Sequence, residues 1–395
     1  MLICVLGRQP ELGIAELEAV LGPGPIVRIS EECVGIREPH GEVKQETLGG
    51  TIKTAKLIAI IPSTKRNRVY AESRSIIAGC LKEAAAASEH KISFGISAYG
   101  MRMGQNQLHK LSFDVKRDLG EAGVNVRVVV GKGSELSSAQ ILHNGLAGGG
   151  CEFLMVEGKT RVYLARTVSV QDIESYSKRD YGRPRRDTKT GMLPPKLAQI
   201  MLNLAGASRM RNVLDPFCGT GVVLMEAALR NCRIMGGDLR AGMVEDTKTN
   251  LRWIGKEYSI KVDASRIECA DATTKRWSER FDRVVSELYL GRQFASLPER
   301  ETLERAMDEC NVIATRFLTN LRRQIDPRVR CCIAVPAWSS PHGFIRLPVV
   351  YRLGDLGYER VEFVHADSKS LIYHRPDQVV ARDLLVLRCK EDQPD

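Results

Sequence analysis

A strand, a glycine-rich turn and a helix follow one another in NVLDPFCGTGVVLMEAA, residues 212–228. The strand is predicted to end at Leu214, and the helix to begin directly after Gly221. From about residue 191 the same alternation continues through RIMGGD, a helix over 242–256, RIECAD, DRVVSELY, a long helix over 299–325 and CCIAVPAW. Such alternation predicts an α/β fold with a mostly parallel sheet and helices on both faces. The last two strand-like runs, YERVEFVHAD and VVARDLLVLRC, predict an antiparallel hairpin at its edge.

The amino-terminal half follows a different pattern of shorter elements. Residues 1–65 alternate strands with one clear helix, PELGIAELEAVLG, as expected for a small α+β unit. Residues 66–168 predict a second unit, with helices over 68–90, 112–123 and 137–150 and a closing hairpin formed by CEFLMVEG and RVYLARTVSV. A basic linker over 169–190 joins this half to a domain spanning 191–395.

The charge of the linker allows two interpretations. KRDYGRPRRDTK carries six Lys or Arg against two Asp. It is either a solvated hinge that stays out of both cores, or a strap whose arginines contact phosphates and release counterions from RNA. The whole chain has a formal net charge of +10, which favours a polyanionic partner.

Length and composition exclude several classes of protein. A chain of 395 residues with 43% hydrophobic residues is expected to form two or three soluble domains. It has no apolar run of membrane-spanning length and no basic leader, so we expect no membrane association and a cytoplasmic location. None of the eleven cysteines forms a C-x-x-C pair, and we therefore expect no metal site.

The turn Asp215–Gly221 is a candidate ligand site, since Gly219 and Gly221 let the backbone approach a ligand closely. A phosphate-binding P-loop would need Lys after the glycines, where Val222 stands. A dinucleotide site would need a third glycine, and Asp215 would repel its pyrophosphate. The cationic donor S-adenosylmethionine fits better. An ordinary turn that binds nothing is the remaining alternative.

Three carboxylates could hold such an adenosyl ligand. Asp215 would face its positive end. Asp238, 17 residues beyond Gly221, would bind the ribose hydroxyls. Asp271 would accept a hydrogen bond from the adenine amine.

These motifs together resemble a known family. LDPFCGTG, GGD and CADA resemble a Rossmann-fold methyltransferase that uses S-adenosylmethionine. RDYGRPRRDTKTGMLPPKLAQIMLNLAG is similar to the junction in THUMP-domain tRNA guanine-N2-methyltransferases, which act on the tenth nucleotide of tRNA. The resemblance extends to the amino-terminal regions of that family, through LGGTIK, FGISAYG, SSAQILHNGL and YLARTVSVQD. It therefore covers nearly the whole chain.

The resemblance implies a ferredoxin-like domain over 1–65, a THUMP domain over 66–168 and a Rossmann-like methyltransferase domain over 191–395. It implies that the first two grip tRNA, with Lys65, Arg66, Arg68, Lys132, Arg183, Arg185 and Arg186 as the RNA-binding residues. It also places Pro195 and Lys196 beside the cofactor. The full expected cofactor set is Pro195, Lys196, Asp215, Pro216, Phe217, Cys218, Gly219, Thr220, Gly221, Asp238, Leu239, Asp271 and Ala272.

One stretch departs from the family pattern. The family carries Asp-Pro-Pro-Tyr at the end of the fourth strand, whereas this chain has Ser286-Glu287-Leu288-Tyr289. A base amine is a poor nucleophile, and accepting hydrogen bonds from it while holding it in line assists transfer. We expect the Ser286 hydroxyl and the Glu287 carbonyl to accept from the amine, the Glu287 side chain to accept from the guanine edge or to take the proton, and Tyr289 to stack on the flipped base.

Three functions remain open at this point. The first is a tRNA methyltransferase that makes N2-methylguanosine. The second is a tRNA-binding protein whose pocket has lost catalysis. The third, DNA adenine methylation, shares the amine chemistry but disagrees with the THUMP-like half. The choice of tRNA, mono- versus dimethylation and a helper subunit are left open.

Overall fold

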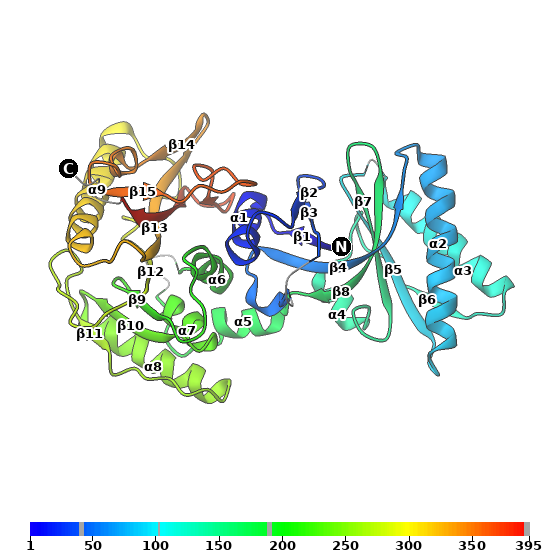
Figure 1. Cartoon of the computed structure of the whole chain (residues 1–395), viewed down its shortest axis with the longest axis horizontal. Coiled ribbons are helices and arrows are strands. Elements are labelled where there is room, and N and C mark those ends of the chain that lie inside the picture. Colours follow the sequence, from blue (N-terminus) through cyan, green and yellow to red (C-terminus); the bar gives the residue numbers. More distant parts are fainter. Residues whose placement is uncertain (39–42, 102, 188–191, 391–395) are drawn as a thin grey trace. The chain divides into compact units, whose positions relative to one another are not determined.

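The structure is a computed structural model that describes residues 1–38, 43–101, 103–187 and 192–390 (Figure 1). It divides into two compact units. Unit 1 comprises residues 1–10, 21–47 and 51–173, and unit 2 comprises 11–20, 48–50 and 174–395. This division does not test the domain boundaries expected from the sequence, which stay a prediction. In the described ranges, no helix combines the length and apolar character needed to cross a membrane.

Unit 1 contains one eight-stranded sheet in the order β2-β3-β1-β4-β8-β7-β5-β6. The long strand β4 pairs antiparallel with β1 on one side and with β8 on the other, which makes the sheet continuous. The predicted hairpin near residue 158 is confirmed as β7 and β8. The strands are β1 (Leu2–Leu6), β2 (Ile26–Arg28), β3 (Cys33–Ile36), β4 (Thr51–Ile61), β5 (Ile92–Tyr99), β6 (Val126–Val128), β7 (Cys151–Glu157) and β8 (Val162–Val170).

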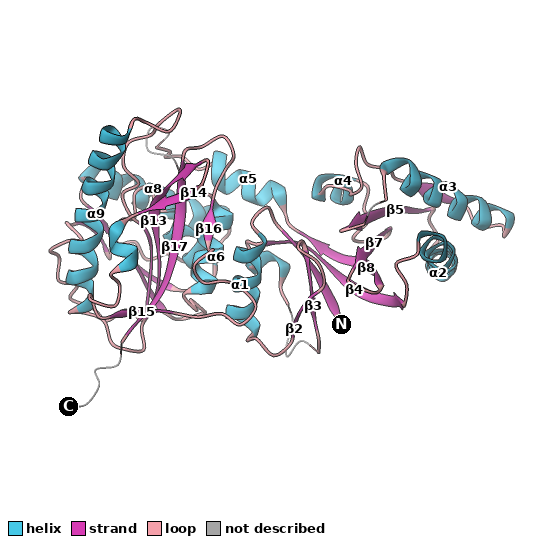
Figure 2. Cartoon of the chain, turned by 90° about the horizontal axis from the view of Figure 1, so that it is seen from above, coloured by secondary structure: helices cyan, strands magenta, loops and turns pink. Residues whose placement is uncertain are grey.

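Three helices of unit 1 match predicted helical segments: α2 (Arg66–Ala86), α3 (Gln105–Glu121) and α4 (Ser138–His143). Helices α2 and α3 lie side by side and share one apolar core with β5, β7 and β8 (Figure 2). Helix α4 is shorter than expected. The Ser137 hydroxyl and the Gln140 side chain form a capping box at its start, and glycines follow soon after its end.

Unit 2 contains the predicted α/β sheet, in the order β11-β10-β9-β12-β13-β17-β15. Strands β9 to β13 pair in parallel, and β17 runs antiparallel between β13 and β15. The expected edge hairpin is therefore confirmed as β15 and β17. The strands are β9 (Asn212–Asp215), β10 (Arg233–Asp238), β11 (Ile267–Cys269), β12 (Arg283–Glu287), β13 (Arg330–Ser340), β14 (Gly343–Arg346), β15 (Tyr358–Arg360), β16 (Ile372–Tyr373) and β17 (Val380–Cys389).

Helices cover both faces of this sheet. Helices α6 (Pro195–Leu204), α7 (Val222–Leu229) and α8 (Ala241–Glu257) lie on one side, and α9 (Arg300–Arg322) lies on the other (Figures 1 and 2). The predicted apolar stripe of α9 faces the core through Leu303, Cys310, Ala314, Phe317 and Leu321, with Met307 at its margin. The Rossmann-like arrangement positions the carboxyl ends of β9, β10 and β12 at one edge, where ligands bind in open α/β sheets.

Helix α1 (Pro10–Leu21) packs within unit 2 although its flanking strands belong to unit 1. The buried Glu16 carboxylate accepts hydrogen bonds from the Gly49 and Gly50 amides at 2.9 and 2.7 Å and from Asn203 Nδ2 at 2.7 Å. Glu18 accepts from two further backbone amides in the segment between β15 and β16. A buried carboxylate needs such donors.

The basic segment after residue 169 contains helix α5 (Ile173–Tyr181). Arg179 on this helix is buried, and its Nε lies 2.6 Å from Glu226 Oε1 on α7. Gln199 on α6 also donates to Glu226, at 3.0 Å. The interpretation as a hinge outside both cores is therefore wrong for this part, because a buried ion pair fixes α5 to the sheet-covering helices.

Candidate active site

The turn between β9 and α7 has the conformation that its glycines allow. Gly219 and Gly221 adopt φ of 50° and 84°, in the left-handed region that disfavours other residues. A Cβ on Gly221 would lie 2.9 Å from Thr247 Cγ2 on α8, so helix packing also requires a glycine here. A Cβ on Gly219 would meet nothing within 4 Å, and this position faces open space. The predicted start of the helix after Gly221 is confirmed.

Asp215 ends β9 and is almost fully buried. Its carboxylate accepts a hydrogen bond from the Ser286 hydroxyl at 2.6 Å and from the Phe217 amide at 3.3 Å. Burial raises the pKa of Asp215 to about 7, since desolvation outweighs these two hydrogen bonds. The nearby carboxylates of Asp238 and Glu287 raise it further. This group therefore changes charge near neutral pH.

Asp238 ends the neighbouring strand β10. Its carboxylate accepts from the Gly219 amide at 3.1 Å and from the Arg240 amide at 2.9 Å. The first bond joins it to the glycine turn, so the two predicted motifs meet in space.

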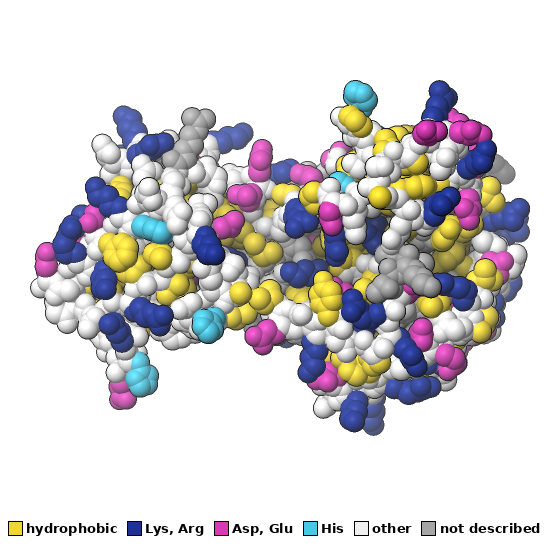
Figure 3. All heavy atoms as spheres, turned by 180° about the vertical axis from the view of Figure 1, so that it is seen from behind, with side chains coloured by type: hydrophobic (Ala, Val, Ile, Leu, Met, Phe, Trp, Pro, Cys, Tyr) yellow, Lys and Arg dark blue, Asp and Glu magenta, His cyan; other side chains and the backbone are white. Residues whose placement is uncertain are grey.

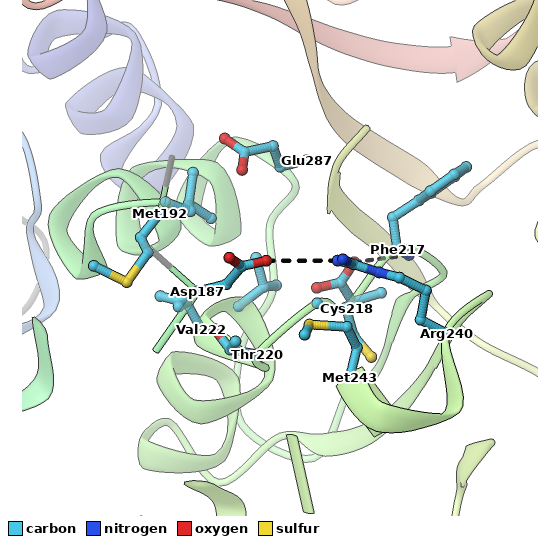
Figure 4. A pocket seen from close by; sticks show the side chains of 13 residues that line it. Asp187, Met192, Phe217, Cys218, Thr220, Val222, Arg240, Met243 and Glu287 are labelled. Carbon is cyan, nitrogen blue, oxygen red and sulfur yellow. Dashed lines mark hydrogen bonds and ion pairs between the residues drawn. The ribbon is translucent and has the colours of Figure 1, made fainter. Parts of the chain in front are cut away.

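A pocket lies above this turn (Figure 4). Asp187 and Arg240 reach toward each other across it, with Oδ2 of Asp187 3.7 Å from an Arg240 amino group. Three carboxylates and one guanidinium line the pocket, which favours a cationic ligand over a phosphate. Its lining consists of Asp187, Met192, Leu193, Asp215, Phe217, Cys218, Gly219, Thr220, Val222, Val223, Arg240, Met243 and Glu287.

Of the expected cofactor residues, the structure brings five to the pocket lining; Asp238 contacts one of these through the Gly219 amide, and Gly221 directly follows another in the chain. The five are Asp215, Phe217, Cys218, Gly219 and Thr220. Pro195, Lys196, Pro216, Leu239, Asp271 and Ala272 lie in neighbouring segments outside this lining. The assignment of all thirteen as cofactor contacts stays a prediction.

Two of these residues make contacts that the sequence did not indicate. The Asp271 carboxylate accepts from the Thr273 amide at 2.9 Å and from its hydroxyl at 2.7 Å, which caps a turn. The Lys196 ammonium lies 5.0 Å from the centre of the Tyr176 ring, and burial lowers the pKa of this lysine.

The stretch Ser286 to Tyr289 begins with the last two residues of β12 and continues past the strand, as expected for a strand end at the active edge. Of its described side chains, Glu287 reaches the pocket lining. Ser286 is fully buried and donates to Asp215, which differs from the expected role of its hydroxyl as a contact in the pocket. Tyr289 is 39% exposed beyond the pocket. Glu287 pairs with Arg382 on β17, and both side chains are largely buried.

Sequence reasoning missed several lining residues. It also missed Arg382, the ion-pair partner of the lining residue Glu287, which lies 95 positions later in a strand that carries no motif. Met192 and Leu193 precede α6, in the junction that resembles the methyltransferase family. Asp187 directly follows the predicted residue Arg186, and Arg240 lies two positions after Asp238. This closeness in the sequence was the signal that could have indicated them.

Most of the predicted RNA-binding residues are exposed, and one is not. Arg183 has to be removed from this set, because its side chain is fully buried and donates to the Arg179 carbonyl at 3.0 Å. Exposed members in unit 1 are Lys65, Arg66, Arg68 and Lys132, and those in unit 2 are Arg185 and Arg186. Figure 3 shows Lys and Arg side chains spread over the visible face rather than gathered in one patch.

Comparison with known proteins finds similarity over the part of the chain that carries this pocket. Residues 183–319 match the family model described as an RMKL-like methyltransferase domain. Two curated relatives are tRNA (guanine(10)-N2)-dimethyltransferases. The one from Methanothermobacter thermautotrophicus is 35% identical over 128 residues, which is 32% of this chain and 36% of that protein. The one from Pyrococcus abyssi is 47% identical over 78 residues, 19% of this chain and 23% of that protein. The chain thus matches about a third or less of either relative's length.

A solved structure resembles the chain over nearly its whole length. The crystal structure of TrmN from Thermus thermophilus has a TM-score of 0.53 and 19% sequence identity, and the match covers 98% of this chain and 99% of that chain. At this identity the similarity supports the fold alone, a Rossmann-like sheet preceded by an α/β sheet unit.

Proposed function

We propose that this chain, whose residues 183–319 match the model of the RMKL-like methyltransferase domain, methylates the exocyclic N2 amine of a guanosine in tRNA. The observation that carries the proposal is the acidic pocket at the carboxyl ends of β9, β10 and β12, in which the buried Asp215 stands beside Glu287. The names of the curated relatives support the substrate and the tenth-nucleotide position. The expected cytoplasmic location belongs to the same proposal.

The residues present fit S-adenosylmethionine as the methyl donor. The donor supplies a methyl group on a sulfonium, which is positively charged before transfer and neutral after it. Asp215, when ionised, offers a negative charge that is itself almost fully shielded from water, where electrostatic attraction is strong. The open space at Gly219 leaves room beside the backbone, and Asp238 holds that backbone in place.

The end of β12 would hold the acceptor. Glu287 lines the pocket and offers carboxylate oxygens to N–H groups of guanine. Ser286 acts indirectly in this proposal, by donating to Asp215 and fixing its orientation. The exposed Tyr289 is available to stack on a base that leaves the RNA stack. Holding the amine in line with the methyl group is the main contribution of these residues.

Exposed basic residues of each unit would contact the phosphates. Lys65, Arg66 and Arg68 lie at the start of α2 in unit 1, and Arg185 and Arg186 lie before the pocket in unit 2. Each phosphate contact steepens the salt dependence of RNA binding. The THUMP assignment of residues 66–168 is part of this proposal.

A catalytically inactive tRNA-binding protein is the second candidate. It is favoured by the ion pair between Glu287 and Arg382 and by the burial of Ser286, which engage two residues of the Ser-Glu-Leu-Tyr stretch within the protein.

One experiment separates the two candidates. Purified full-length protein is incubated with a tRNA transcript and S-adenosylmethionine, and the digested nucleosides are measured by mass spectrometry. N2-methylguanosine or its dimethyl form is expected, at one position. Tight tRNA binding without any methylated guanosine would refute the proposal and support the binding protein. Gly221→Ala, which forces a Cβ against Thr247, should abolish the product, whereas Gly242→Ala on α8, with open space around it, should not.

A further inference from the structure

A second pocket lies beside the first in unit 2, with about 710 Å³ of empty space. One wall is the segment that follows the Ser-Glu-Leu-Tyr stretch, and the opposite wall is the start of β17 with the residues before it. Its lining consists of Leu290, Gly291, Arg292, Gln293, Phe294, Asp377, Gln378, Val379, Val380 and Arg382.

The chemistry of this lining suits a nucleotide. Phe294 offers an aromatic ring, and the Arg292 guanidinium lies 5.9 Å from the ring centre. Gln293 and Gln378 provide side-chain amides, which both donate and accept hydrogen bonds. An aromatic ring, amides and arginines together provide stacking, edge recognition and phosphate attraction.

The ion pair between Glu287 and Arg382 joins the two pockets. Glu287 lines the first pocket and Arg382 lines the second. Strand β13 separates their strands, so the Arg382 side chain spans a distance of about 10 Å between the backbones of β17 and β12. The side chains are 17% and 5% exposed, which removes most of the competing water.

We infer that the second pocket takes the acceptor guanosine, and that Arg382 together with Glu287 determines the specificity for guanine. This inference rests on the proposed function. Glu287 accepts from N1–H and the N2 amine, and Arg382 donates to the O6 acceptor of the same base. Arg382 bonds to Glu287 through its Nε–H, and a guanidinium carries five N–H donors in a planar fork.

The pair rejects the other purines for stated reasons. Adenine presents an amine where guanine presents O6, and its N1 carries no hydrogen for a carboxylate to accept. 2-Aminopurine retains the reactive amine at C2 but lacks both O6 and the N1 hydrogen. It therefore isolates base recognition from methyl transfer.

The test measures kcat/KM on two tRNA transcripts, one with guanosine and one with 2-aminopurine at the methylated position. The wild-type protein should prefer guanosine by roughly 10- to 100-fold. Arg382→Met should reduce this preference by roughly 5-fold or more, by slowing guanosine while leaving 2-aminopurine nearly unchanged, and the part that comes from the N1–H contact with Glu287 should remain. Arg388→Met is the matched control. Arg388 lies on the same strand as Arg382, but it pairs with Glu359 on β15 and is largely exposed. Its preference should equal that of the wild type.

Three outcomes are distinguishable. An equal loss on both transcripts for Arg382→Met would show a structural role and overturn the inference. An unchanged preference would overturn it as well. Absence of methylation of either transcript by the wild-type protein would refute the proposed function itself. If Arg382→Met does not fold, Arg382→Lys retains the charge without the planar fork, and its preference should fall between the wild-type value and one.

Discussion

Asp215→Asn should remove a large pH dependence from the stability of unit 2. Asp215 is almost fully buried, and among its described contacts the donors are the Ser286 hydroxyl and the Phe217 amide. Its pKa is about 7 in the folded protein, against an ordinary value of 3.8. Asparagine has nearly the same shape and retains an oxygen that accepts from both donors. The substitution therefore changes the titration with little change in packing.

The direction and size of the effect follow from the raised pKa. The folded protein binds the Asp215 proton more tightly than the unfolded chain does. The resulting stability is fully present below the unfolded pKa and is lost as the pH rises through the folded pKa near 7. Between pH 5 and pH 8 this carboxyl alone should lower the free energy of unfolding by roughly 2.5 kcal/mol. The Asp215→Asn protein lacks this carboxyl, so its free energy of unfolding should not fall by that amount over the same pH range.

Urea unfolding followed by tryptophan fluorescence measures this difference in unit 2 specifically. All three tryptophans of the chain, Trp253, Trp277 and Trp338, lie in unit 2. The wild-type minus Asp215→Asn difference in unfolding free energy should change by roughly 2.5 kcal/mol between pH 5 and pH 8. Asp326→Asn is the control, since an arginine partner lowers the pKa of this exposed carboxyl to about 2, outside the measured range. Parallel pH curves for wild type and Asp215→Asn would refute the reasoning.

Three further changes test other parts of the structure. Gly49→Ala would place a Cβ 2.1 Å from the Lys196 carbonyl, so α6 must shift; we expect a loss of about 1–3 kcal/mol in urea unfolding, and an unchanged midpoint would contradict this packing. Arg179→Met leaves the Glu226 carboxylate buried without its partner and should cost about 3–5 kcal/mol, measured in the same way; a loss below 1 kcal/mol would argue against a buried pair. Arg66→Ala should reduce the slope of log affinity for tRNA against log salt by about 1 in filter binding, and an equal slope would exclude this phosphate contact.

The local elements of unit 2 were predictable because their signals are local. The glycine turn needs residues without a Cβ at 219 and 221, and the strand before it and the helix after it follow from short apolar runs. The stripe of α9 follows from the helical period. The parallel orientation of the strands follows from the strand–helix alternation.

Tertiary partners distant in the chain were not predictable. Glu16 contacts Asn203 across 187 positions, and no periodicity in either helix indicates that pair. Arg179 and Arg183 belong to a segment whose composition is typical of a solvated linker, yet both side chains are buried. Arg179 pairs with Glu226, and Arg183 donates to the Arg179 carbonyl. Arg382 lies near Glu287 because β17, the last strand, pairs with β13, and the other neighbour of β13 is β12, which carries Glu287. Composition reports average exposure, whereas individual charged groups are buried wherever a specific partner compensates their desolvation.

The serine at position 286 gives a physical reason for one departure from the related family pattern. Its hydroxyl lies 2.6 Å from the Asp215 carboxylate and donates to it, which opposes the effect of burial on the pKa of Asp215. An aspartate at position 286 would bring a second carboxylate close to the first, and two such groups at hydrogen-bond distance cannot both ionise readily. Asp215 would then be protonated at neutral pH, or its partner would be. A donor at 286 instead lets Asp215 ionise near pH 7, where a cationic ligand in the pocket favours the charged form. The serine and the buried aspartate are therefore compatible with each other and with a methyl donor that carries positive charge.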